Sequence, residues 1–415
     1  MRVLQINNHH ALKGGSERVY LGTGRLLASK GHEVFYFGTG TDSGGIDESR
    51  VRILPPDPFE QQGFVNRVRR AGRFIYSGRV ADALDDLLRD TKPDIAHLHI
   101  FYGQLSNSIL PVLRKHGVPC VMSVHEYRML CPAYVMYDRE GRVCERCADG
   151  GYAPAVTKKC VKGSVVGSLV AAAECWARDR FFSYSKYISR FIMVSEFCRD
   201  IHVRFRPELA AKSRALFNFV DVDSFAPQES HEGYFLYLGR LSREKGVSTL
   251  IQAARDLGLK LKIVGGGDLD AQLRAMVGDD ASIEFLGFKS GGELAGLVRN
   301  AKFVCVPSEW YENNPMSVIE SFAYGKPVIG SRIGGIPELV RHGETGFLFD
   351  LGNAHSLKEV MSVAAELNDQ EYSLMSRASR SFVEKNNSEE GHYSALIDVY
   401  KDAIEAFRMQ MRGIS

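Results

Sequence analysis

Long hydrophobic runs are missing from this sequence of 415 residues. A helix that crosses a bilayer needs about 20 consecutive apolar residues, whereas the best candidate, residues 165–173, is less than half as long. The first residues, MRVLQIN, alternate like a strand and lack the apolar stretch of a signal peptide. We therefore expect no membrane-spanning segment and a cytoplasmic location.

Cysteine is scarce outside one segment, and no compositional bias marks the chain as fibrous or disordered. Hydrophobic residues make up 45% and charged residues 25%, with 40 Gly and 14 Pro, which is an ordinary globular balance. Seven of the eight cysteines lie between residues 120 and 198. In a cytosolic chain, such local use favours metal binding or chemistry over disulfides.

The two halves of the chain carry opposite net charges. Residues 1–220 contain 32 Lys and Arg against 22 Asp and Glu, whereas residues 221–415 contain 20 against 28. A basic half joined to an acidic half indicates that the first half meets an anionic partner. Nucleic acid, anionic lipid and phosphorylated small molecules all fit, and charge alone does not choose among them.

Short apolar runs with strand character alternate with helical patterns in both halves. The runs lie at 3–7, 33–37, 51–54, 94–99, 118–124, 234–239, 261–266, 282–287, 303–308 and 326–331. This alternation predicts an α/β protein with two Rossmann-like parallel-sheet domains facing a central cleft. Open parallel sheets bind ligands at the carboxyl ends of their strands, so we expect a ligand between the domains.

The restart of the pattern after residue 220 sets the predicted domain boundaries. We expect an N-terminal Rossmann-like domain over 1–220 and a C-terminal Rossmann-like domain over 221–390. A closing helix over 391–415 is expected to pack back on the N-terminal domain.

Glycine-rich turns and cations follow several predicted strands. The N–H groups of Gly14 and Gly15, at the start of a helix, suit an anion. Arg240 and Lys245 leave a strand end of the second domain, where two cations suit a diphosphate. Gly265 opens another glycine turn, without the full spacing of a dinucleotide-binding loop. Taken singly, each of these turns is also common as an ordinary connection.

The stretch PSEWYENNPMSVIE carries two carboxylates eight residues apart. Pro315 suits the first position of a helix, with Asn313 or Asn314 as its cap. Glu320 then lies inside the helix, and Glu312 lies in the loop before it. Each carboxylate can accept hydrogen bonds from two hydroxyls, which suits a sugar and a ribose, although two Glu residues at this spacing are more often ordinary surface charges. The helix N-terminus between them suits a phosphate.

In their order along the chain, these motifs resemble the retaining glycosyltransferases of family four, which have the GT-B fold. The resemblance covers nearly the whole chain. Its markers are the Gly14-Gly15 loop, Val194-Ser195, Asn218-Phe219-Val220-Asp221, GRLSREKG, the Glu312 and Glu320 pair, SFAYGKPVIGSRIGGIPELV and GETGFLF. It implies transfer of a sugar from a nucleotide-sugar donor, with 1–220 as the acceptor-binding domain and 221–390 as the nucleotide-sugar-binding domain.

The resemblance also implies a role for each motif residue. Glu312 would bind hydroxyls of the donor sugar and Glu320 the ribose diol, while Arg240 and Lys245 would neutralise the diphosphate leaving group. His125, at a strand end, would touch the sugar near the reacting carbon. The implied catalytic set is His125, Glu312, Arg240 and Lys245. Further donor-binding residues implied are Gly14, Gly15, Gly265, Phe288, Asn313, Asn314, Pro315, Met316 and Ser317.

A catalytic metal is not expected. The departing diphosphate gains negative charge, which fixed donors stabilise, and in this family retention follows from front-face attack by the acceptor. Two D-x-D triplets, at 221–223 and 268–270, would suit a Mn-dependent class, but one lies in the interdomain joint and the other in a glycine turn. The family often has Gly where this chain has Asn313 to Pro315, and Glu126 stands where Asp commonly follows the histidine.

A cysteine-rich loop over 126–163 is this chain's own feature. Cys131, Cys144, Cys147 and Cys160 are spaced so that a C-x2-C knuckle stands between two further thiols. This pattern favours a structural, four-coordinate zinc ion. An iron–sulfur cluster, disulfides and free thiols remain alternatives.

Four arginines and no acidic residue lie in the segment FVNRVRRAGRFI, residues 64–75. Its apolar residues fall on one helical face, so it suits an anionic membrane surface or a pyrophosphate-linked lipid. A solvated helix with a core-facing stripe is the plain alternative.

The sequence therefore predicts a hexosyltransferase that moves a sugar to a glycan acceptor, lipid-linked, in polysaccharide or glycolipid synthesis. A nucleotide-sugar epimerase or phosphorylase on the same fold is one alternative. A zinc-stapled nucleic-acid-binding protein is another, although the cysteine segment lacks interleaved aromatic and basic residues. We expect nucleotide sugar, glycan acceptor and membrane surface as partners, and no nucleic acid.

Overall fold

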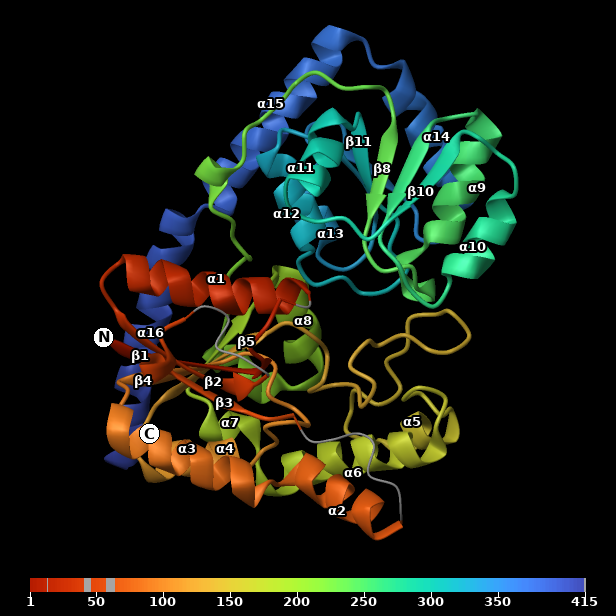
Figure 1. Ribbon diagram of the computed structural model, residues 1–415. Helices are drawn as coiled ribbons and strands as arrows, with labels where there is room; N and C mark the ends of the chain where they lie inside the picture. Colours follow the sequence, from red (N-terminus) through yellow and green to blue (C-terminus); the bar gives the residue numbers. More distant parts are fainter. Residues whose placement is uncertain (13, 41–45, 57–63, 414–415) are drawn as a thin grey trace.

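The computed structural model describes residues 1–12, 14–40, 46–56 and 64–413, and from 64 to 68 the backbone alone. It contains two α/β domains, each built around an all-parallel sheet (Figure 1). The predicted fold class is confirmed in this respect. The exact boundaries at 220, 221, 390 and 391 stay predictions.

Seven strands form the first sheet, in the order β3-β2-β1-β4-β5-β6-β7. They are β1 (Arg2–His9), β2 (Glu33–Thr39), β3 (Val51–Leu54), β4 (Ile95–Leu98), β5 (Cys120–Val124), β6 (Arg190–Met193) and β7 (Ser213–Ala215). Strands β1 to β5 fall on the apolar runs of the sequence. Strands β6 and β7 lie outside the predicted runs.

Six strands form the second sheet, in the order β10-β9-β8-β11-β12-β13. They are β8 (Phe235–Leu238), β9 (Leu261–Val264), β10 (Ile283–Gly287), β11 (Phe303–Val306), β12 (Val328–Ser331) and β13 (Gly346–Phe349). All but β13 fall on predicted runs. In each sheet the first three strands run from the centre to one edge, and the later strands run from the centre to the other edge. The strand order therefore reverses between β1 and β4 in the first sheet and between β8 and β11 in the second.

Helices cover both faces of each sheet, as parallel strands require. The first domain contains α1 (Gly15–Ser29), α2 (Phe64–Ile75), α3 (Gly78–Thr91), α4 (Ile109–Lys115), α5 (Ala153–Thr157), α6 (Val165–Phe181), α7 (Tyr184–Tyr187) and α8 (Glu196–Phe205). The second contains α9 (Val247–Leu257), α10 (Asp270–Val277), α11 (Gly291–Asn300), α12 (Met316–Ala323), α13 (Ile336–Leu339), α14 (Ala354–Glu366) and α15 (Asp369–Asn386).

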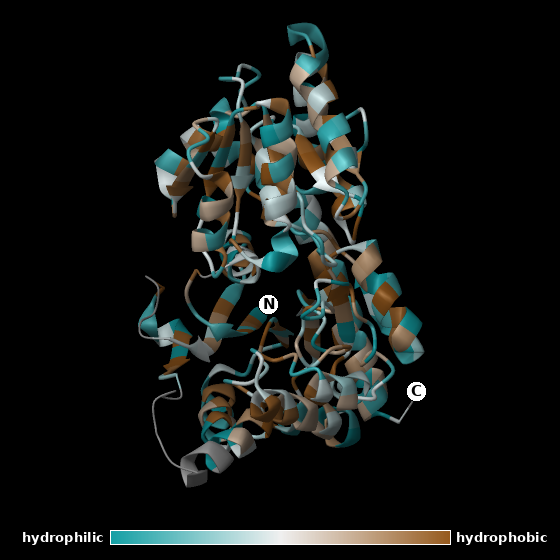
Figure 2. Cartoon of the chain, turned by 90° about the vertical axis from the view of Figure 1, so that its right-hand side faces the viewer, coloured by the Kyte–Doolittle hydropathy of each residue, from teal (hydrophilic) through white to brown (hydrophobic). Residues whose placement is uncertain are grey.

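The last helix, α16 (Glu389–Met411), returns to the first sheet (Figure 1). Alternate side chains of β1 enter opposite layers of the core. Leu4 and Ile6 join the layer below α3 and α4, whereas Val3 joins Tyr20 of α1 and Tyr400 of α16. Gln5 points to the same side as Val3 and is fully buried, with Tyr400 as a neighbour. The strands carry most of the hydrophobic colour in Figure 2, which places the core of each domain in and around its sheet. In the described part of the chain, no helix is long and apolar enough to cross a bilayer.

Candidate functional site

Glu312 lies in the loop between β11 and α12, where it is buried with two polar neighbours. Lys245 Nζ donates a hydrogen bond to Glu312 Oε1 over 2.5 Å, and Ser308 Oγ donates to the same oxygen over 2.7 Å. Burial opposes ionisation of the carboxyl, but the Lys245 ammonium outweighs it and holds the Glu312 pKa below its ordinary value. Glu312 is therefore an ionised, oriented acceptor. Two of the predicted residues meet directly here.

Two glycines that the sequence analysis did not single out hold this loop from the other side. A Cβ on Gly334, whose φ is +60°, would stand 2.2 Å from the Glu312 carbonyl oxygen, and one on Gly335 would stand 1.9 Å from that of Asn313. The Gly335 N–H donates to the Glu312 carbonyl over 2.7 Å. Backbone packs on backbone, so only glycine fits. The GG in SRIGGIPEL was a visible signal for this contact.

The capping expected at the start of α12 is wrong. The helix begins at Met316, with Pro315 as its N-cap and no side-chain capping bond. Asn313 instead donates from Nδ2 to the His125 carbonyl over 2.9 Å, across the domain boundary. Asn314 faces the joint between the domains, where its Oδ1 accepts from the Asn218 N–H over 2.9 Å. Both asparagines therefore form hydrogen bonds to distant segments instead of capping α12. In the described residues, Asn313 Oδ1 and Asn314 Nδ2 remain buried without a partner.

Glu320 lies inside α12, as predicted, and is paired with Arg18 of α1. Burial raises the Glu320 pKa, and Arg18 opposes that rise. A Cβ on Gly15, the first residue of α1, would touch Met316 at 3.4 Å, so the two helix N-termini lie close together. Ser317 lies in the first turn of α12, and its carbonyl accepts from the Ser321 hydroxyl. Lys13, next to Gly14, lies outside the described residues.

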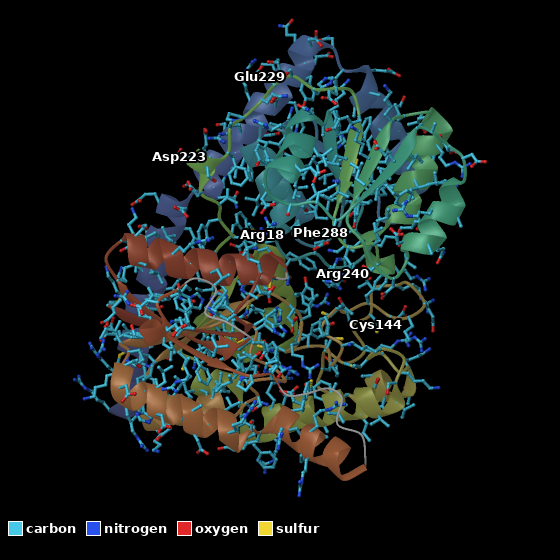
Figure 3. All side chains as sticks on the ribbon, viewed as in Figure 1. Arg18, Cys144, Asp223, Glu229, Arg240 and Phe288 are labelled. Carbon is cyan, nitrogen blue, oxygen red and sulfur yellow. The ribbon has the colours of Figure 1, made fainter. Side chains whose placement is uncertain are left out.

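The remaining donor-binding candidates line the edge of the second domain. Arg240 is exposed, and Figure 3 shows it at the domain boundary with Arg18 and Phe288. Phe288 is 84% exposed. Gly265 has φ +130°, and a Cβ there would stand 1.9 Å from the Gly239 carbonyl oxygen. The turn therefore needs glycine for close backbone packing.

His125 directly follows β5 and is stacked on a second histidine that the sequence analysis did not single out. Its Nε2 lies 2.9 Å from Nδ1 of His99, and the ring planes are 8° apart. Burial lowers the His125 pKa to about 4, so the ring is neutral near pH 7. Burial raises the pKa of the adjacent Glu126 to about 7. A neutral imidazole and a carboxyl that titrates near neutrality thus stand side by side.

The cysteine-rich loop reaches the second domain, which its sequence did not indicate. Arg243 donates to the carbonyls of Arg139 and Glu140 over 2.8 and 2.6 Å. Tyr311, the residue before Glu312, donates to the Glu145 carboxylate over 2.9 Å. The loop therefore forms one wall beside the Glu312 segment.

All four cysteines of the zinc prediction line the same cavity of about 20 Å³, room for no more than a water or a single ion. They are Cys131, Cys144, Cys147 and Cys160. All eight cysteines are described and free, so the disulfide alternative is not realised in this structure. However, no group of three or more His, Cys, Asp or Glu side chains within the described ranges is arranged to hold a metal ion. The structure brings the thiols together without forming a metal site.

The D-x-D triplets lie apart from this constellation. Asp223 is exposed on the connection between the domains, away from the boundary residues (Figure 3). Asp270 begins α10 and pairs with Arg274 over 2.8 Å. Neither triplet joins the Glu312 segment.

Two family models together match most of the chain. "Glycosyltransferase Family 4" matches residues 13–224, more than half of the chain, and "Glycosyl transferases group 1" matches residues 222–381. The chain belongs to glycosyltransferase family 4. The resemblance inferred from the motifs is thereby confirmed.

Curated members of this glycosyltransferase family match parts of the chain. An uncharacterised glycosyltransferase of Methanocaldococcus jannaschii is 32% identical over 43% of this chain and 50% of its own length. The phosphatidyl-myo-inositol mannosyltransferase of Mycobacterium tuberculosis is 35% identical over 32% of this chain and 38% of its own. The matched segments thus span half or less of these relatives, so activity and substrates do not transfer directly.

Solved glycosyltransferase structures match the whole fold. Anabaena HepE, in complex with UDP and glucose, superposes with a TM-score of 0.67 at 15% identity, covering 97% of this chain and 99% of that one. The sucrose-phosphate synthase of Thermosynechococcus elongatus gives 0.71 at 19% identity, covering 98% and 99%. At such identities the match shows the fold alone, which is GT-B.

Proposed function

We propose that this protein transfers a hexosyl group from a nucleotide sugar to a glycan acceptor, with retention of anomeric configuration. One observation carries the proposal: the buried Glu312 carboxylate is held ionised by Lys245 at the domain boundary, beside the N-terminus of α12. A carboxylate in this position suits two sugar hydroxyls. The lysine beside it suits the diphosphate oxygens. UDP-sugars are the first donors to test, because HepE was solved with UDP and glucose.

The proposed mechanism uses charge that is already in place. Arg240 and Lys245 stabilise the negative charge on the leaving diphosphate, and the first turn of α12 adds its unpaired N–H groups. The unpartnered Asn313 Oδ1 and Asn314 Nδ2 lie in the same loop and leave two polar atoms to be satisfied when the site fills. Glu320 binds the ribose once it leaves Arg18. None of these steps needs a catalytic metal.

Glu312→Gln, assayed with a panel of radiolabelled nucleotide sugars, tests this proposal. The variant keeps the size of the side chain and the Ser308 contact, yet it loses the charge, so we expect transfer to fall at least 100-fold. Asp223→Asn is the matched control, because it removes an exposed carboxylate from one of the D-x-D triplets. Full transfer by Glu312→Gln would refute the role of this residue. Loss in Asp223→Asn, with EDTA-sensitive activity restored by Mn²⁺, would support the metal-dependent class.

We propose further that the acceptor is lipid-linked and that the protein binds an anionic membrane surface from the cytoplasmic side. Helix α2 forms as predicted and packs against α6 at the base of the first domain (Figure 1). Arg69, Arg70 and Arg73 of α2 are exposed. On α6, Leu169 and Trp176 are 56% and 59% exposed on one helical face. Exposed apolar side chains beside cations support contact with anionic lipid.

Flotation with vesicles measures this contact. We expect binding to vesicles that contain phosphatidylglycerol, weakened by 0.5 M salt, and little binding to pure phosphatidylcholine. Leu169→Ala should weaken it, whereas Leu374→Ala, which removes an equally exposed leucine from α15 of the second domain, should not. Equal binding to both vesicle types would refute the electrostatic part of the proposal.

The structural zinc ion also remains a proposal. It is supported by the C-x2-C spacing and by the common cavity, and it requires the four side chains to close on the ion from their present arrangement. Metal analysis of protein purified under reducing, chelator-free conditions should find about one zinc per chain, and less after Cys144→Ser. Cys305→Ser, in the second sheet, is the control. Absence of zinc from the unaltered protein would end the proposal.

A further inference from the structure

A buried hydrogen-bond relay runs through the first sheet and ends at His125. Gln5 of β1 lies with its Oε1 2.9 Å from Nε2 of His99, the residue after β4. Nδ1 of His99 lies 2.9 Å from Nε2 of His125. Gln5 and His99 are fully buried, so water does not compete for these contacts.

Tyr400, at the end of the relay opposite His125, determines how the Gln5 amide is oriented. Its Nε2 donates to the Tyr400 hydroxyl of α16 at 3.5 Å, which directs Oε1 toward His99. The Tyr400 hydroxyl lies 2.8 Å from Nδ1 of His97, and Nε2 of His97 lies 2.8 Å from the Ser123 hydroxyl. With this orientation each group has a complementary partner: the amide gives its proton to Tyr400, Tyr400 gives its own to His97, and His97 gives its Nε2 proton to Ser123.

All histidines of the relay are neutral near pH 7. Burial lowers the pKa of His97 to about 3 and that of His125 to about 4, and it lowers that of His99 strongly. A neutral imidazole has one N–H donor and one bare acceptor nitrogen. Each ring must therefore pass on a fixed polarity: a donor on one side implies an acceptor on the other.

That polarity determines the tautomer of His125. An amide oxygen only accepts, so Nε2 of His99 carries the proton and its Nδ1 is bare. Nε2 of His125 must then carry a proton to donate to that bare nitrogen. The remaining atom, His125 Nδ1, keeps its lone pair. No hydrogen bond to this nitrogen occurs within the described ranges, and His125 is only partly buried.

We propose that Gln5 and His99 are positioning residues that hold His125 as its neutral Nε2–H tautomer, with Nδ1 turned outward as an acceptor for a substrate hydroxyl. The tautomer follows from the geometry of the chain, whereas the hydroxyl ligand rests on the proposed sugar transfer. The group that His125 recognises is thus an O–H donor of the sugar or the acceptor, and not an anion. His125 gives no charge to the leaving group, which leaves that role to Arg240 and Lys245.

Nitrogen NMR of protein labelled with ¹⁵N in histidine tests the tautomer without any assay of activity. Ring-nitrogen shifts at pH 7 distinguish a protonated from a bare nitrogen, and His125→Gln identifies the signals of this residue. We expect protonated Nε2 and bare Nδ1 in the unaltered protein. Gln5→Met, which removes the acceptor at nearly constant size, should give a mixture of tautomers. The reverse tautomer in the unaltered protein, or no change in Gln5→Met, would overturn the relay.

Two further variants separate the relay from general damage. His99→Phe removes both ring nitrogens and should have the same effect on His125 as Gln5→Met. His116→Asn removes a histidine that contacts Asp85 on the far side of α3 and should leave the His125 signals unchanged. Where Gln5→Met or His99→Phe melts more than 10 °C below the unaltered protein, the ring-nitrogen shifts of the unaltered protein decide, because the reverse tautomer there overturns the relay.

Steady-state kinetics test the hydroxyl contact. Gln5→Met should lower the transfer rate about fivefold to tenfold, as expected for one misdirected hydrogen bond, and Gln5→Glu should restore it. An unchanged rate in Gln5→Met, with the tautomer shown to be mixed, would overturn the contact. If the NMR result holds and no nucleotide sugar is turned over by the unaltered protein, the relay stands and the proposed function fails.

Discussion

Replacing Lys245 by methionine should expose the energetic cost of the buried carboxylate at Glu312. Methionine keeps most of the apolar stem but removes the ammonium that contacts Glu312 Oε1 over 2.5 Å. The carboxylate then keeps only the Ser308 hydroxyl and the loop around it. Removal of one partner from a buried ion pair costs about 3–5 kcal/mol. Because the Lys245 side chain is 23% exposed, water can reach part of the pair, and we expect about 3 kcal/mol.

The cost depends on pH in a direction set by the Glu312 pKa. In the unaltered protein the folded pKa lies below the ordinary 4.5, so the pair contributes stability above that pH and loses it as pH falls through the folded pKa. In Lys245→Met, burial acts without the cation and raises the pKa, so the folded state is penalised increasingly as pH rises. The stability difference should be largest at pH 8 and shrink toward pH 4.

Thermal unfolding of both proteins at pH 8, 6 and 4.5 measures this difference. For a domain of about 200 residues, about 3 kcal/mol corresponds to a fall in Tm of roughly 6–12 °C. Lys245→Arg, which keeps the positive charge, should lose less than half as much at pH 8. A Tm difference that is the same at all three pH values would refute the reasoning, because a packing defect has no such pH dependence.

Three further substitutions test the glycine turn, the carboxyl beside His125 and a contact between the domains. Gly265→Ala should lower stability by more than about 3 kcal/mol, because its Cβ would collide with backbone at 1.9 Å, whereas Gly266→Ala, with open space around it, should stay within about 0.5 kcal/mol in the same melting assay. Glu126→Gln should not change stability at pH 4 but should raise it by up to about 3 kcal/mol at pH 8, measured by urea unfolding. The folded pKa of Glu126 is about 7, so its carboxylate destabilises the fold progressively from pH 4.5 to 7. Glu338→Ala should cost about 1–2 kcal/mol, read as a lower Tm, because Glu338 accepts the N–H groups of the first two residues of α8 across the domain boundary.

The sequence was sufficient to predict the sheets wherever a strand is long or strongly apolar. Residues 33–37 and 303–308, for example, have no other stable place than the middle of a covered sheet. Strands β6, β7 and β13 lie outside the predicted runs, although β6 and β13 are no shorter than predicted strands such as β3 and β8. Their positions are fixed by pairing with neighbours that are distant in sequence, such as β6 with β5.

The candidate site was likewise predictable only in part. Glu312, Lys245 and Glu320 were predicted because their spacing resembles a family pattern, and the structure adds the partners that no spacing reveals. Arg18 reaches Glu320 from a helix 302 residues away in sequence. The caps expected from Asn313 and Asn314 are absent. Local propensity favours these side chains as caps of α12, but in the structure Asn313 binds the His125 carbonyl and Asn314 binds the Asn218 N–H. Such contacts depend on how the domains face each other, which single-sequence patterns do not encode.

Both carboxylates of the family pattern are thus occupied by cations in the free protein: Glu312 by Lys245, and Glu320 by Arg18. A nucleotide sugar brings the complementary set, hydroxyls for the carboxylates and phosphate charge for the cations. On the proposed function, donor binding would exchange these two ion pairs for hydroxyl contacts to the carboxylates and phosphate contacts to the cations. Because Arg18 belongs to the first domain and Glu320 to the second, this exchange also removes one link between the domains. If Glu320 binds the ribose as proposed, donor binding and domain arrangement would be coupled through Glu320, whereas the Glu312–Lys245 pair lies within one domain and would exchange without changing that link.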